Sequence, residues 1–357
     1  MRRFKALLLL SAFGAASLAG CSKNTTVESS VSEEPVKVSP ESITFDWQQP
    51  YEDQLKDFMA SENYDPEPDT GSAFEIIDIT GDGKPELIIS PSADKQSSCS
   101  IYTCEAGSVT PLGEVGFFGE FDYLPELGLI HDEYGGDGFV LGKYMAYTDG
   151  AFTEKLTYSD NSGEASDGAT IVHEINGEEV LLGDYESALA DYENTRIVRV
   201  GRKYLMADKT VQYAVRRAES WGAVLDGKQK ELCRSKLTEL MPDFGEESDP
   251  AFELCDLNGD DTPELIVSES SVPDAQCRIF YFSGSELAAL DGKYGCQGEV
   301  KFDVDQLVFY SETPTEKTYW SLADSGFSAE SYVSSGNIMT AGRKYALTDE
   351  NITAAFA

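Results

Sequence analysis

The sequence predicts an α+β protein made of two tandem repeated domains, each an antiparallel sheet with helices at its ends and one acidic strand–loop–strand. Three observations support this prediction. One stretch of 17 residues occurs twice, strand-like runs outnumber helical ones, and turn signals rich in glycine separate the runs. A chain of 357 residues is also long enough for two domains of ordinary size.

The repeated stretch is the strongest of these observations. Its copies are Phe74–Ser90 (FEIIDITGDGKPELIIS) and Phe252–Ser268 (FELCDLNGDDTPELIVS), which lie 178 residues apart and are identical at ten of 17 positions. Each copy reads as an apolar strand, a tight acidic loop and a second apolar strand. The spacing is far longer than one propeller blade, so the sequence indicates duplication of a whole domain.

Other segments keep the same order in both copies. Gly201–Tyr204 returns as Gly342–Tyr345 at an offset of 141, so the second copy lacks 37 residues (178 − 141). The missing part corresponds most simply to a hairpin at Asn176–Gly177 and the helix after it. We therefore assign 45–217 to the first repeat domain and 218–357 to the second.

Strands and helices are expected where the apolar spacing has a period of two or of 3.6 residues. The expected strands of the first domain beyond the acidic stretch are Cys99–Cys104, Val115–Phe121, Phe139–Tyr147, Thr170–Ile175 and Glu178–Leu182. Five helices are expected. Pro50 opens the first, which continues to Met59, and Asp184 caps the second, which ends near Tyr192. The third starts at Asp208, the fourth covers Lys228–Met241 and the fifth starts at Thr348.

The first twenty residues are predicted to be a signal peptide. Three basic side chains among the first five residues precede an apolar run, Ala6–Ala19, that is too short for a stable transmembrane helix. The run ends in Leu-Ala-Gly-Cys at 18–21, which resembles the lipobox of bacterial lipoproteins. The resemblance implies that the thiol of Cys21 receives a diacylglycerol and that Cys21 becomes the mature N-terminus with its acyl (palmitate-type) chains. The alternative is a secreted protein whose cleavage site happens to contain cysteine.

The lipoprotein resemblance implies a protein anchored to the cell membrane by its lipid alone and facing outside the cytoplasm. Ser22 is not the aspartate that retains lipoproteins in the inner membrane, and the choice between inner and outer membrane stays open. Residues 21–44 are rich in Ser, Glu, Val, Thr and Pro without apolar periodicity. We therefore expect a disordered tether between the lipid and the folded domains.

The charge of the chain is strongly acidic, with 64 Asp and Glu against 27 Lys and Arg. Removing the signal peptide also removes three of the basic residues, so the mature chain has a formal charge of −40 (24 − 64). Such a surface repels nucleic acid and anionic lipid headgroups, which argues against direct binding to either. It attracts cations and keeps an exported protein soluble.

The loop inside each repeated stretch is a candidate cation site. Oxygen-bearing side chains stand at loop positions one, three, five and nine, and the residue at position seven offers its carbonyl, which is the alternating oxygen set that calcium takes. These residues are Asp78, Thr80, Asp82, Lys84 and Glu86 in the first loop, and Asp256, Asn258, Asp260, Thr262 and Glu264 in the second. Gly83 at position six permits a positive φ, and Asp261 replaces it in the second loop at some conformational cost.

This pattern resembles the D-x-[DN]-x-D-G-x-x-[DE] loop of FG-GAP and related calcium-loop repeats, and the first half of an EF-hand loop. The EF-hand proper does not fit, because position twelve is Ile89 or Val267 rather than glutamate and strands flank the loop. The wider pattern is similar to uncharacterised surface lipoproteins of Gram-positive anaerobes. The resemblance implies up to two calcium ions with a structural role. The alternative is a plain acidic hairpin turn.

Six cysteines remain after Cys21, and the sequence leaves free thiols and disulfides equally open. Cys99 and Cys104 are an odd number of residues apart on one expected strand, so they should face opposite ways. Cys255 stands in place of Ile77 of the first copy, which indicates a buried apolar position. Without any C-x-x-C, neither a zinc ribbon nor thioredoxin chemistry is indicated.

The sequence has little that indicates catalysis. It has only two histidines, His131 and His173, in unrelated contexts, and no nucleophile or nucleotide-binding motif. The segment His131–Gly138 reads as an unusual loop, either a hairpin end, a ligand loop or a third cation site. We expect a calcium-binding interaction or ligand-binding module without catalysis, whose partner is an extracellular protein or glycan. The alternative is an extracytoplasmic hydrolase that acts on glycans or cell-wall material.

Overall fold

A computed structural model describes residues 45–67, 70–136, 139–161, 172–193, 195–215, 221–245, 248–312, 317–323, 326–328 and 334–356. The expected signal peptide, Cys21 and the expected tether lie outside these ranges. We refer to residues 45–217 as the first half and to 218–357 as the second half.

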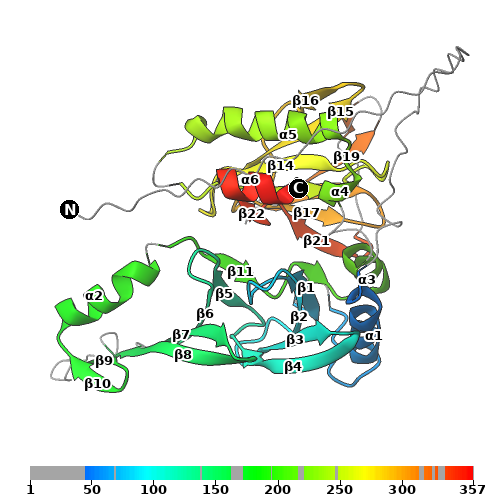
Figure 1. The fold of residues 1–357 in the computed structure, drawn as a ribbon. Helices are drawn as coiled ribbons and strands as arrows, with labels where there is room; N and C mark the ends of the chain where they lie inside the picture. The colour runs from blue at the N-terminus through cyan, green and yellow to red at the C-terminus, as the bar shows by residue number, and fades with distance from the viewer. Residues whose placement is uncertain are drawn as a thin grey trace, which may run out of the picture. The chain divides into compact units, whose positions relative to one another are not determined.

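The described residues form far more strand than helix (Figure 1). The strands of the first half are β1 (Ala73–Ile77), β2 (Glu86–Ser90), β3 (Cys99–Glu105), β4 (Ser108–Val115), β5 (Phe121–Leu124), β6 (Leu129–Gly136), β7 (Phe139–Thr148), β8 (Ala151–Asp160), β9 (His173–Ile175), β10 (Glu178–Val180), β11 (Val198–Val200) and β12 (Tyr204–Leu205). Those of the second half are β13 (Ala251–Cys255), β14 (Glu264–Ser268), β15 (Cys277–Ser283), β16 (Glu286–Ala289), β17 (Val300–Asp303), β18 (Val308–Glu312), β19 (Lys317–Ala323), β20 (Gly326–Ser328), β21 (Ile338–Ala341) and β22 (Tyr345–Ala346).

Helices stand at the ends of the strand runs. They are α1 (Gln48–Met59), α2 (Leu182–Glu193), α3 (Asp208–Tyr213), α4 (Trp221–Val224), α5 (Gly227–Leu240) and α6 (Asp349–Ala355), with a short 3-10 helix at Met241–Asp243. The helices predicted over Lys228–Met241 and from Thr348 are confirmed. Asp226 caps α5 by accepting the N–H of Gln229, and Thr348 caps α6 by accepting that of Asn351.

Three sheets hold the strands of the described ranges. Their strand orders are β20-β19-β18-β17-β21-β12-β1-β2-β3-β4, β10-β9-β8-β7-β6-β5-β11 and β16-β15-β14-β13-β22. The neighbouring strands run antiparallel, and most are joined by short hairpins. The predicted α+β class with antiparallel sheets is therefore confirmed.

Equivalent strands in the two halves pair in the same register. Phe74 lies opposite Ile89 across β1 and β2, and Phe252 lies opposite Val267 across β13 and β14. The short strands β12 and β22 then pair with β1 and β13 on the opposite side from β2 and β14. This order follows from the pattern, because each apolar five-residue run is buried on both faces and needs a partner on both edges.

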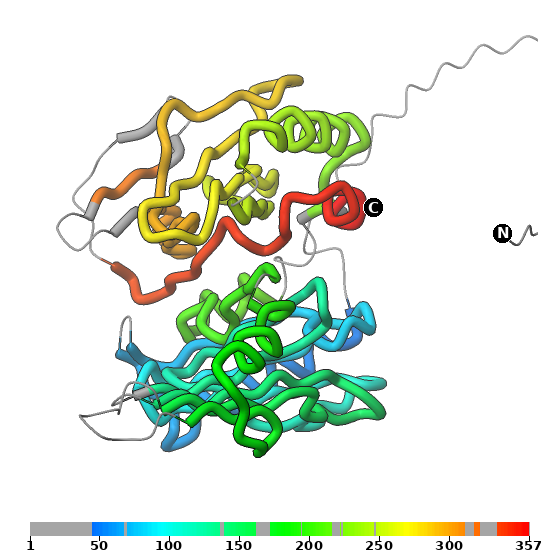
Figure 2. The backbone as a smooth tube through the Cα atoms, turned by 90° about the vertical axis from the view of Figure 1, so that its left-hand side faces the viewer, coloured from blue at the N-terminus to red at the C-terminus, as the bar shows by residue number. Residues whose placement is uncertain are grey.

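The two halves are joined through one sheet. Tyr204 of β12 lies opposite Met339 of β21, and the N–H of Thr340 donates to the carbonyl of Lys203 at 2.7 Å. Figure 2 shows this join, where the red segment around β21 faces the green strands of the first half. The ten-stranded sheet is therefore built from strands of both halves.

The core contains buried side chains from helices of both halves. Tyr51 and Leu55 of α1 are fully buried in one hydrophobic cluster with Phe74, and Leu237 of α5 is fully buried in the same cluster with Phe252. Burial of one such side chain contributes about 1.5–3 kcal/mol. Figure 1 shows α5 lying along the strands β14 to β16, the sheet that its apolar face covers.

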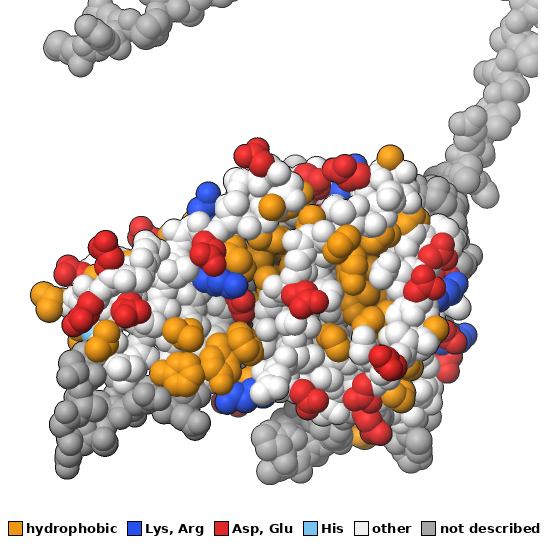
Figure 3. Space-filling view, turned by 90° about the horizontal axis from the view of Figure 1, so that it is seen from below, with side chains coloured by type: hydrophobic (Ala, Val, Ile, Leu, Met, Phe, Trp, Pro, Cys, Tyr) orange, Lys and Arg blue, Asp and Glu red, His pale blue; other side chains and the backbone are white. Residues whose placement is uncertain are grey.

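Acidic side chains outnumber basic ones on the face of the molecule that Figure 3 shows. Figure 3 shows one face of the molecule, with acidic side chains scattered across it among fewer basic ones. This distribution fits the formal charge of −37 of the whole chain and its expected effect on solubility.

Several local predictions are wrong in detail. Val115–Phe121 is not a strand, because Gly116, Phe118 and Gly119 have positive φ and make a turn between β4 and β5. Residues 131–136 of the expected loop His131–Gly138 belong to strand β6, while 137–138 lie outside the described residues. The glycines at 135 and 136 are paired with β7, so tertiary pairing overrides their turn preference.

Helix starts are also displaced. Pro50 is the third residue of α1 rather than the first, where its missing N–H is still tolerated because the first turn has no intrahelical acceptors. Asp184 lies in the first turn of α2 and does not cap it. The expected strand Glu178–Leu182 ends at Val180, and Leu182 begins the helix. Of the expected strand Thr170–Ile175, residues 170–171 lie outside the described ranges and β9 covers the remainder from His173.

The first half contains β9, β10 and α2 between β8 and β11, in the region where the sequence predicts a segment that the second half lacks. Asn176 and Gly177 both have positive φ at the tip of the β9–β10 hairpin, as the Asn-Gly turn predicts. In the second half only nine residues separate β20 from β21, which is too short for this hairpin and helix.

Candidate functional site

The first acidic loop closes the hairpin between β1 and β2 around the carboxylate of Asp78. Its two oxygens accept the N–H groups of Gly81 at 2.7 Å and Gly83 at 2.9 Å. Glu86, the first residue of β2, is fully buried and accepts the N–H of Ile79 at 3.0 Å. Carboxylates at positions one and nine therefore organise the backbone of the loop.

The remaining first-loop residues lie nearer the solvent. Asp82 is exposed and accepts the N–H of Lys84 at 2.8 Å. The hydroxyl of Thr80 lies 3.4 Å from Glu86 Oε1, so positions three and nine come together. Lys84 is exposed at position seven, and its backbone is tied to Asp82.

The second loop, between β13 and β14, repeats this arrangement. Asp256 accepts the N–H groups of Gly259 at 2.7 Å and Asp261 at 3.1 Å, and Glu264 accepts that of Leu257 at 2.7 Å. Asp260 accepts the N–H of Thr262 at 2.7 Å. Each of these hydrogen bonds has its counterpart in the first loop.

Position six has the backbone conformation that the sequence predicts. Gly83 has φ of 86° and Asp261 has φ of 61°. A Cβ at Gly83 would meet no atom within 4 Å, so the demand for glycine there comes from the backbone and not from crowding. Asp261 accepts the same conformation at a cost that Gly83 avoids.

Asn258 at position three adds a contact that the first loop lacks. Its side-chain Nδ2 lies 3.3 Å from Asp260 Oδ2 and 3.2 Å from Glu264 Oε1. The positive end of the amide dipole thus stands between two carboxylates. This is the place where a cation bound by the same two oxygens would stand.

Buried carboxyls in both loops hold their protons more tightly than usual. Burial raises the pKa of Glu86 to about 7, against the hydrogen bond from Ile79 and with added repulsion from Asp78. Burial also raises the pKa of Glu264 and, more moderately, that of Asp256. A nearby cation would lower all three, because it favours the ionised carboxylates.

The donor set of each loop fits a hard cation such as calcium, since three carboxylates and one hydroxyl or amide provide only oxygen ligands. The carboxylates of positions one and nine point at backbone N–H groups of the loop. Within the described residues no three His, Cys, Asp or Glu side chains are gathered as a metal site requires. Binding therefore requires side chains such as Asp82 and Asp260 to turn inward.

The six cysteines of the described residues are free thiols. Cys99 and Cys104 lie on opposite faces of β3 and belong to different hydrophobic clusters, which confirms the prediction from their odd spacing. Cys255 is buried, as its alignment with an isoleucine predicts. Burial raises the pKa of the Cys255 thiol, so it is not a reactive thiolate.

Both histidines lie in the seven-stranded sheet and contact one group of tyrosines, so the expectation of unrelated contexts is wrong. His131 of β6 stacks on Tyr144 at 4.3 Å, and His173 of β9 lies 5.1 Å from Tyr185. The Tyr158 hydroxyl donates to Glu133 at 2.5 Å, which leaves it to accept from His131 Nε2 at 2.7 Å. Burial raises the pKa of Tyr158, which keeps this hydroxyl protonated.

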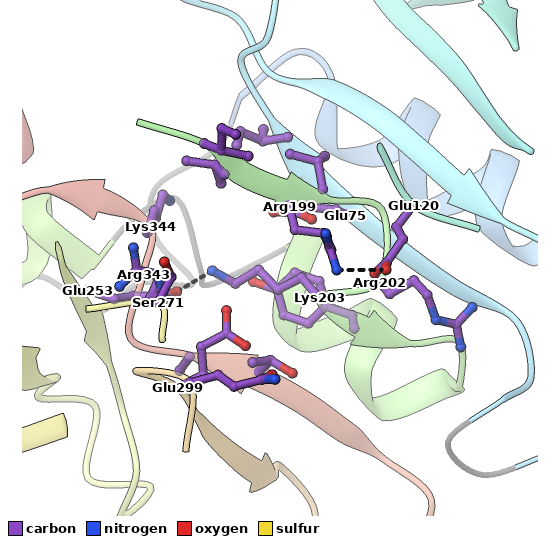
Figure 4. Close-up of a pocket in the computed structure, with 18 of the residues that line it drawn as sticks. Glu75, Glu120, Arg199, Arg202, Lys203, Glu253, Ser271, Glu299, Arg343 and Lys344 are labelled. Atoms are coloured by element: carbon purple, nitrogen blue, oxygen red, sulfur yellow. Dashed lines mark hydrogen bonds and ion pairs between the residues drawn. The ribbon is translucent and has the colours of Figure 1, made fainter. Parts of the chain in front are cut away.

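A cleft between the two halves is the feature that sequence reasoning missed. It has a volume of about 530 Å³ and is lined from both halves by charged side chains. Figure 4 shows Lys203 in its centre, with Glu75 and Glu120 on one side and Glu253 and Glu299 on the other. A cavity of this size is typical of small-ligand sites.

Lys203 connects the halves inside the cleft. Its ammonium pairs with Glu253 of β13, and both side chains are nearly buried, at 13% and 5% exposure. The other oxygen of Glu253 accepts the N–H of Gly342 at 2.8 Å, just as Glu75 accepts that of Gly201 at 2.9 Å. Gly201–Tyr204 and Gly342–Tyr345, the second repeated segment, therefore serve as backbone partners of equivalent glutamates.

Comparison with known proteins found no family model, no curated protein and no solved structure that matches this chain. Within the residues that the structure describes, no helix is long and apolar enough to cross a membrane.

Proposed function

We propose that this protein is a calcium-binding, extracytoplasmic ligand-binding module that a lipid on Cys21 anchors to the cell membrane. The observation that carries the calcium part is the repeated hydrogen-bond pattern of the two acidic loops. In both, buried carboxyls with raised pKa stand beside further carboxylates. An ion that relieves this repulsion stabilises the loop that holds it.

Each loop would hold one ion through the residues at its alternating positions. These are Asp78, Thr80, Asp82, the carbonyl of Lys84 and Glu86 in the first loop, and Asp256, Asn258, Asp260, the carbonyl of Thr262 and Glu264 in the second. In the second loop the ion would displace the Asn258 amide from between Asp260 and Glu264, and the amide would then offer its oxygen.

The role of the ion in this proposal is structural. Each loop joins two buried strands, β1 to β2 or β13 to β14, and an ion that binds only the folded loop stabilises the fold by mass action. The proposal also treats the halves as tandem copies of one α+β domain. The equivalent registers of β1–β2 and β13–β14 support this.

The location rests on the lipobox resemblance. One acyl chain binds membranes only marginally, and the two or three chains of a bacterial lipoprotein provide stable anchoring. The strongly acidic chain has no complementarity to nucleic acid, so the partner is an extracellular protein or a glycan. The test is Cys21→Ser, which should move the protein from the membrane fraction to the soluble fraction and abolish labelling by an alkyne-tagged palmitate.

Calorimetric titration of the full mature protein in detergent, after chelation, tests the calcium part. We expect two calcium sites, or one strong and one weak, with magnesium binding much more weakly. A melting curve should move to higher temperature with calcium. No heat of binding and an unchanged melting temperature would show that both loops are plain acidic turns.

A hydrolase acting on glycans is the second candidate, and one observation favours it. The cleft contains several carboxyls, and burial raises the pKa of Glu75 and of Glu299 to about 7 in each case. A carboxyl that is still protonated near neutral pH can act as a general acid. Release of reducing ends from purified cell-wall glycan, lost in both Glu75→Gln and Glu299→Gln, would support this candidate over the first.

A further inference from the structure

Two of the sheets end at the same cleft. Within the described ranges, the seven-stranded sheet ends at β11 and the five-stranded sheet ends at β22. The cleft is lined by Val198, Arg199 and Val200 of β11 from the first half and by Lys344, the residue before β22, from the second. In Figure 1, β22 lies above β11. The cleft therefore lies where the last strands of two sheets come near each other.

The corresponding strands elsewhere in the molecule are paired with each other. β12 pairs with β21, and this pair joins the halves in the ten-stranded sheet. β22 has the place in the second half that β12 has in the first, since each pairs with the first strand of the repeated stretch. β11 has the place of β21, since β11 pairs with β5 as β21 pairs with β17. Pairing of β22 with β11 would be the counterpart of the β12–β21 join, and the sheet orders of the described residues do not contain it.

The backbone of β11 should present an N–H group to the cleft. In β21, Thr340 lies opposite Lys301 of β17, and its N–H donates to the carbonyl of Lys203 at 2.7 Å. Arg199 has the same position in β11, opposite Asp122 of β5. Successive N–H groups of an antiparallel strand point to opposite edges, so the N–H of Arg199 should face away from β5 as that of Thr340 faces away from β17.

A side chain links the two strands at one end of the cleft. Arg196 stands two residues before β11, and its Nη2 donates at 3.3 Å to the carbonyl of Arg343, two residues before β22. The link is therefore made by a side chain and not by paired backbones, which would lie about 4.8 Å apart. Within the described residues, the Nε of Arg196 is buried and has no hydrogen-bond acceptor. A buried donor of this kind is costly unless a further acceptor is supplied.

The charges of the cleft do not select a ligand of one sign. Five acidic and five basic side chains line it, and Figure 4 shows members of both groups around Lys203. Some of them already pair with each other, Arg199 with Glu120 at 3.4 Å and Lys203 with Glu253. Ile197 adds an apolar side chain that is 41% exposed. The lining therefore suits a ligand with little net charge that offers both hydrogen-bond donors and acceptors.

An extended peptide has these properties. It carries N–H and C=O groups along both edges at the spacing of a strand, and such peptides add a strand to the open edge of a sheet. The cleft volume of about 530 Å³ is in the range of ligand sites. β11 has three residues, which present an edge about 10 Å long at about 3.3 Å per residue. A glycan offers no row of backbone N–H and C=O groups to such an edge.

We propose that the cleft binds an extended peptide segment of a partner protein, which inserts as a strand between β11 and β22. A carbonyl of the peptide would accept the N–H of Arg199, as the carbonyl of Lys203 accepts that of Thr340 in the β12–β21 join. The inserted strand would connect the seven-stranded and five-stranded sheets. The proposal rests on the proposed function in treating the chain as a ligand-binding module, and it narrows the partner to a protein. It requires no calcium.

The test is calorimetric titration of the full mature protein with a peptide that has acetylated and amidated ends. The peptide copies Asn337–Gly342, the segment that contains β21, because β21 fills the corresponding edge of β12. A tetramer of N-acetylglucosamine is the glycan probe. We expect the peptide to bind and the tetramer not to bind. Absence of peptide binding, or binding of the tetramer alone, would overturn the proposal.

Two N-methylated forms of the peptide test whether it inserts between both strands. One carries methyl groups on the amides that correspond to Ile338 and Thr340, and the other on those of Met339 and Ala341. Because successive N–H groups face opposite edges, each form blocks one edge of the peptide. We expect each form to bind about tenfold more weakly or worse, since it loses hydrogen bonds and clashes with the neighbouring strand. Full affinity of either form contradicts insertion between two strands.

Two substitutions at one position test the edge of β11. Arg199→Pro removes the N–H that should face the cleft, and proline is tolerated on an edge strand whose N–H points away from the sheet. Arg199→Ala removes the same side chain and keeps the N–H. Peptide binding should be lost in Arg199→Pro and kept in Arg199→Ala, with melting curves showing that both variants fold. Equal affinity of the two variants for the peptide argues against the assigned edge.

Calcium titration of the same variants separates this proposal from the calcium proposal. The candidate calcium ligands of the acidic loops are not among the residues that line the cleft, so Arg199→Pro should bind calcium as the unchanged protein does. Peptide binding without calcium binding would overturn the calcium proposal alone. Loss of both in Arg199→Pro would show a general effect on the fold and would overturn the assignment to the N–H of Arg199.

Discussion

Glu75 and Glu253 occupy the same place in the two halves, but their surroundings differ. Both accept a backbone N–H, from Gly201 or from Gly342, on the same strand-to-strand connection. Only Glu253 also has a direct ion pair, with Lys203. Both halves thus have the same glutamate-to-backbone hydrogen bond at this connection, while the ion pairs around it differ.

The same contrast separates Glu120 from Glu299. The first has Arg199 as a partner, and the equivalent of that arginine near the second is Thr340. The acidic loops show the opposite behaviour, because both keep the same hydrogen bonds despite Thr80 replacing Asn258 and Gly83 replacing Asp261. The two halves therefore differ in the ion pairs of the cleft more than in the hydrogen bonds of the loops.

The largest expected effect is the difference in unfolding free energy between substitutions of Glu253 and Glu75. Glu253→Gln keeps the Gly342 hydrogen bond but leaves the nearly buried ammonium of Lys203 without its contacting carboxylate. We expect it to lower the free energy of unfolding by about 3–5 kcal/mol. Glu75→Gln removes a carboxyl with no direct cation and should change it by less than about 1 kcal/mol at pH 7.5. Urea unfolding in calcium-free buffer measures both, and equal losses would contradict the contrast.

Calcium should produce the next largest effect. At a concentration one hundred times the dissociation constant, one site contributes about 2.7 kcal/mol of stability. Asp82→Ala or Asp260→Ala should each remove part of the calcium-induced rise in melting temperature and leave the melting temperature in chelator nearly unchanged. Melting curves with and without calcium check this. Equal changes in both conditions would mean that these side chains serve only the turn.

The pH dependence of stability should also reveal the buried carboxyls. Burial raises the pKa of Glu75, Glu86 and Glu299 to about 7 from an ordinary value of 4.5, so the folded chain binds more protons than the unfolded chain between these values. Stability in chelator should therefore be complete below about pH 4.5 for these groups and fall as pH rises through 7, by at least about 1 kcal/mol.

Saturating calcium should flatten this fall, since a bound cation lowers the pKa of Glu86 and favours its ionised form. Urea unfolding at several pH values, with chelator and with calcium, gives both curves. A stability that rises steadily from pH 5 to pH 7.5 in chelator would contradict the assignment of raised pKa values to these carboxyls.

The smallest effect concerns position six of the loops. Asp261→Gly removes a side chain from a residue with positive φ and should stabilise the fold by about 0.5–1 kcal/mol, while Gly83→Ala should cost about 1 kcal/mol. Because a Cβ at Gly83 meets no neighbouring atom, packing does not obscure the comparison. Urea unfolding of both variants checks the opposite signs, and a destabilised Asp261→Gly would show that the side chain itself supports the loop.

Local pattern was sufficient to predict several of the hairpins and helices of this protein. The apolar runs of Phe74–Ser90 form β1 and β2, and the helical spacing of apolar residues in Lys228–Met241 corresponds to α5. Asn176–Gly177 forms the turn of the β9–β10 hairpin. The turn at Val115–Phe121 was missed because its glycines interrupt an otherwise apolar run. The strand at His131–Gly136 was missed because pairing with β7 outweighs the local preference of glycine for turns.

The acidic loops follow from local sequence, since positive φ at position six and the carboxylates of positions one and nine act within nine residues of chain. The cleft arises from contacts between residues far apart in the chain. Lys203 meets Glu253 across 50 residues, and Glu75 meets Gly201 across 126. No periodic pattern in the sequence predicts contacts at such separations. They depend on how β12 and β21 join the halves and not on the residues nearby in the chain.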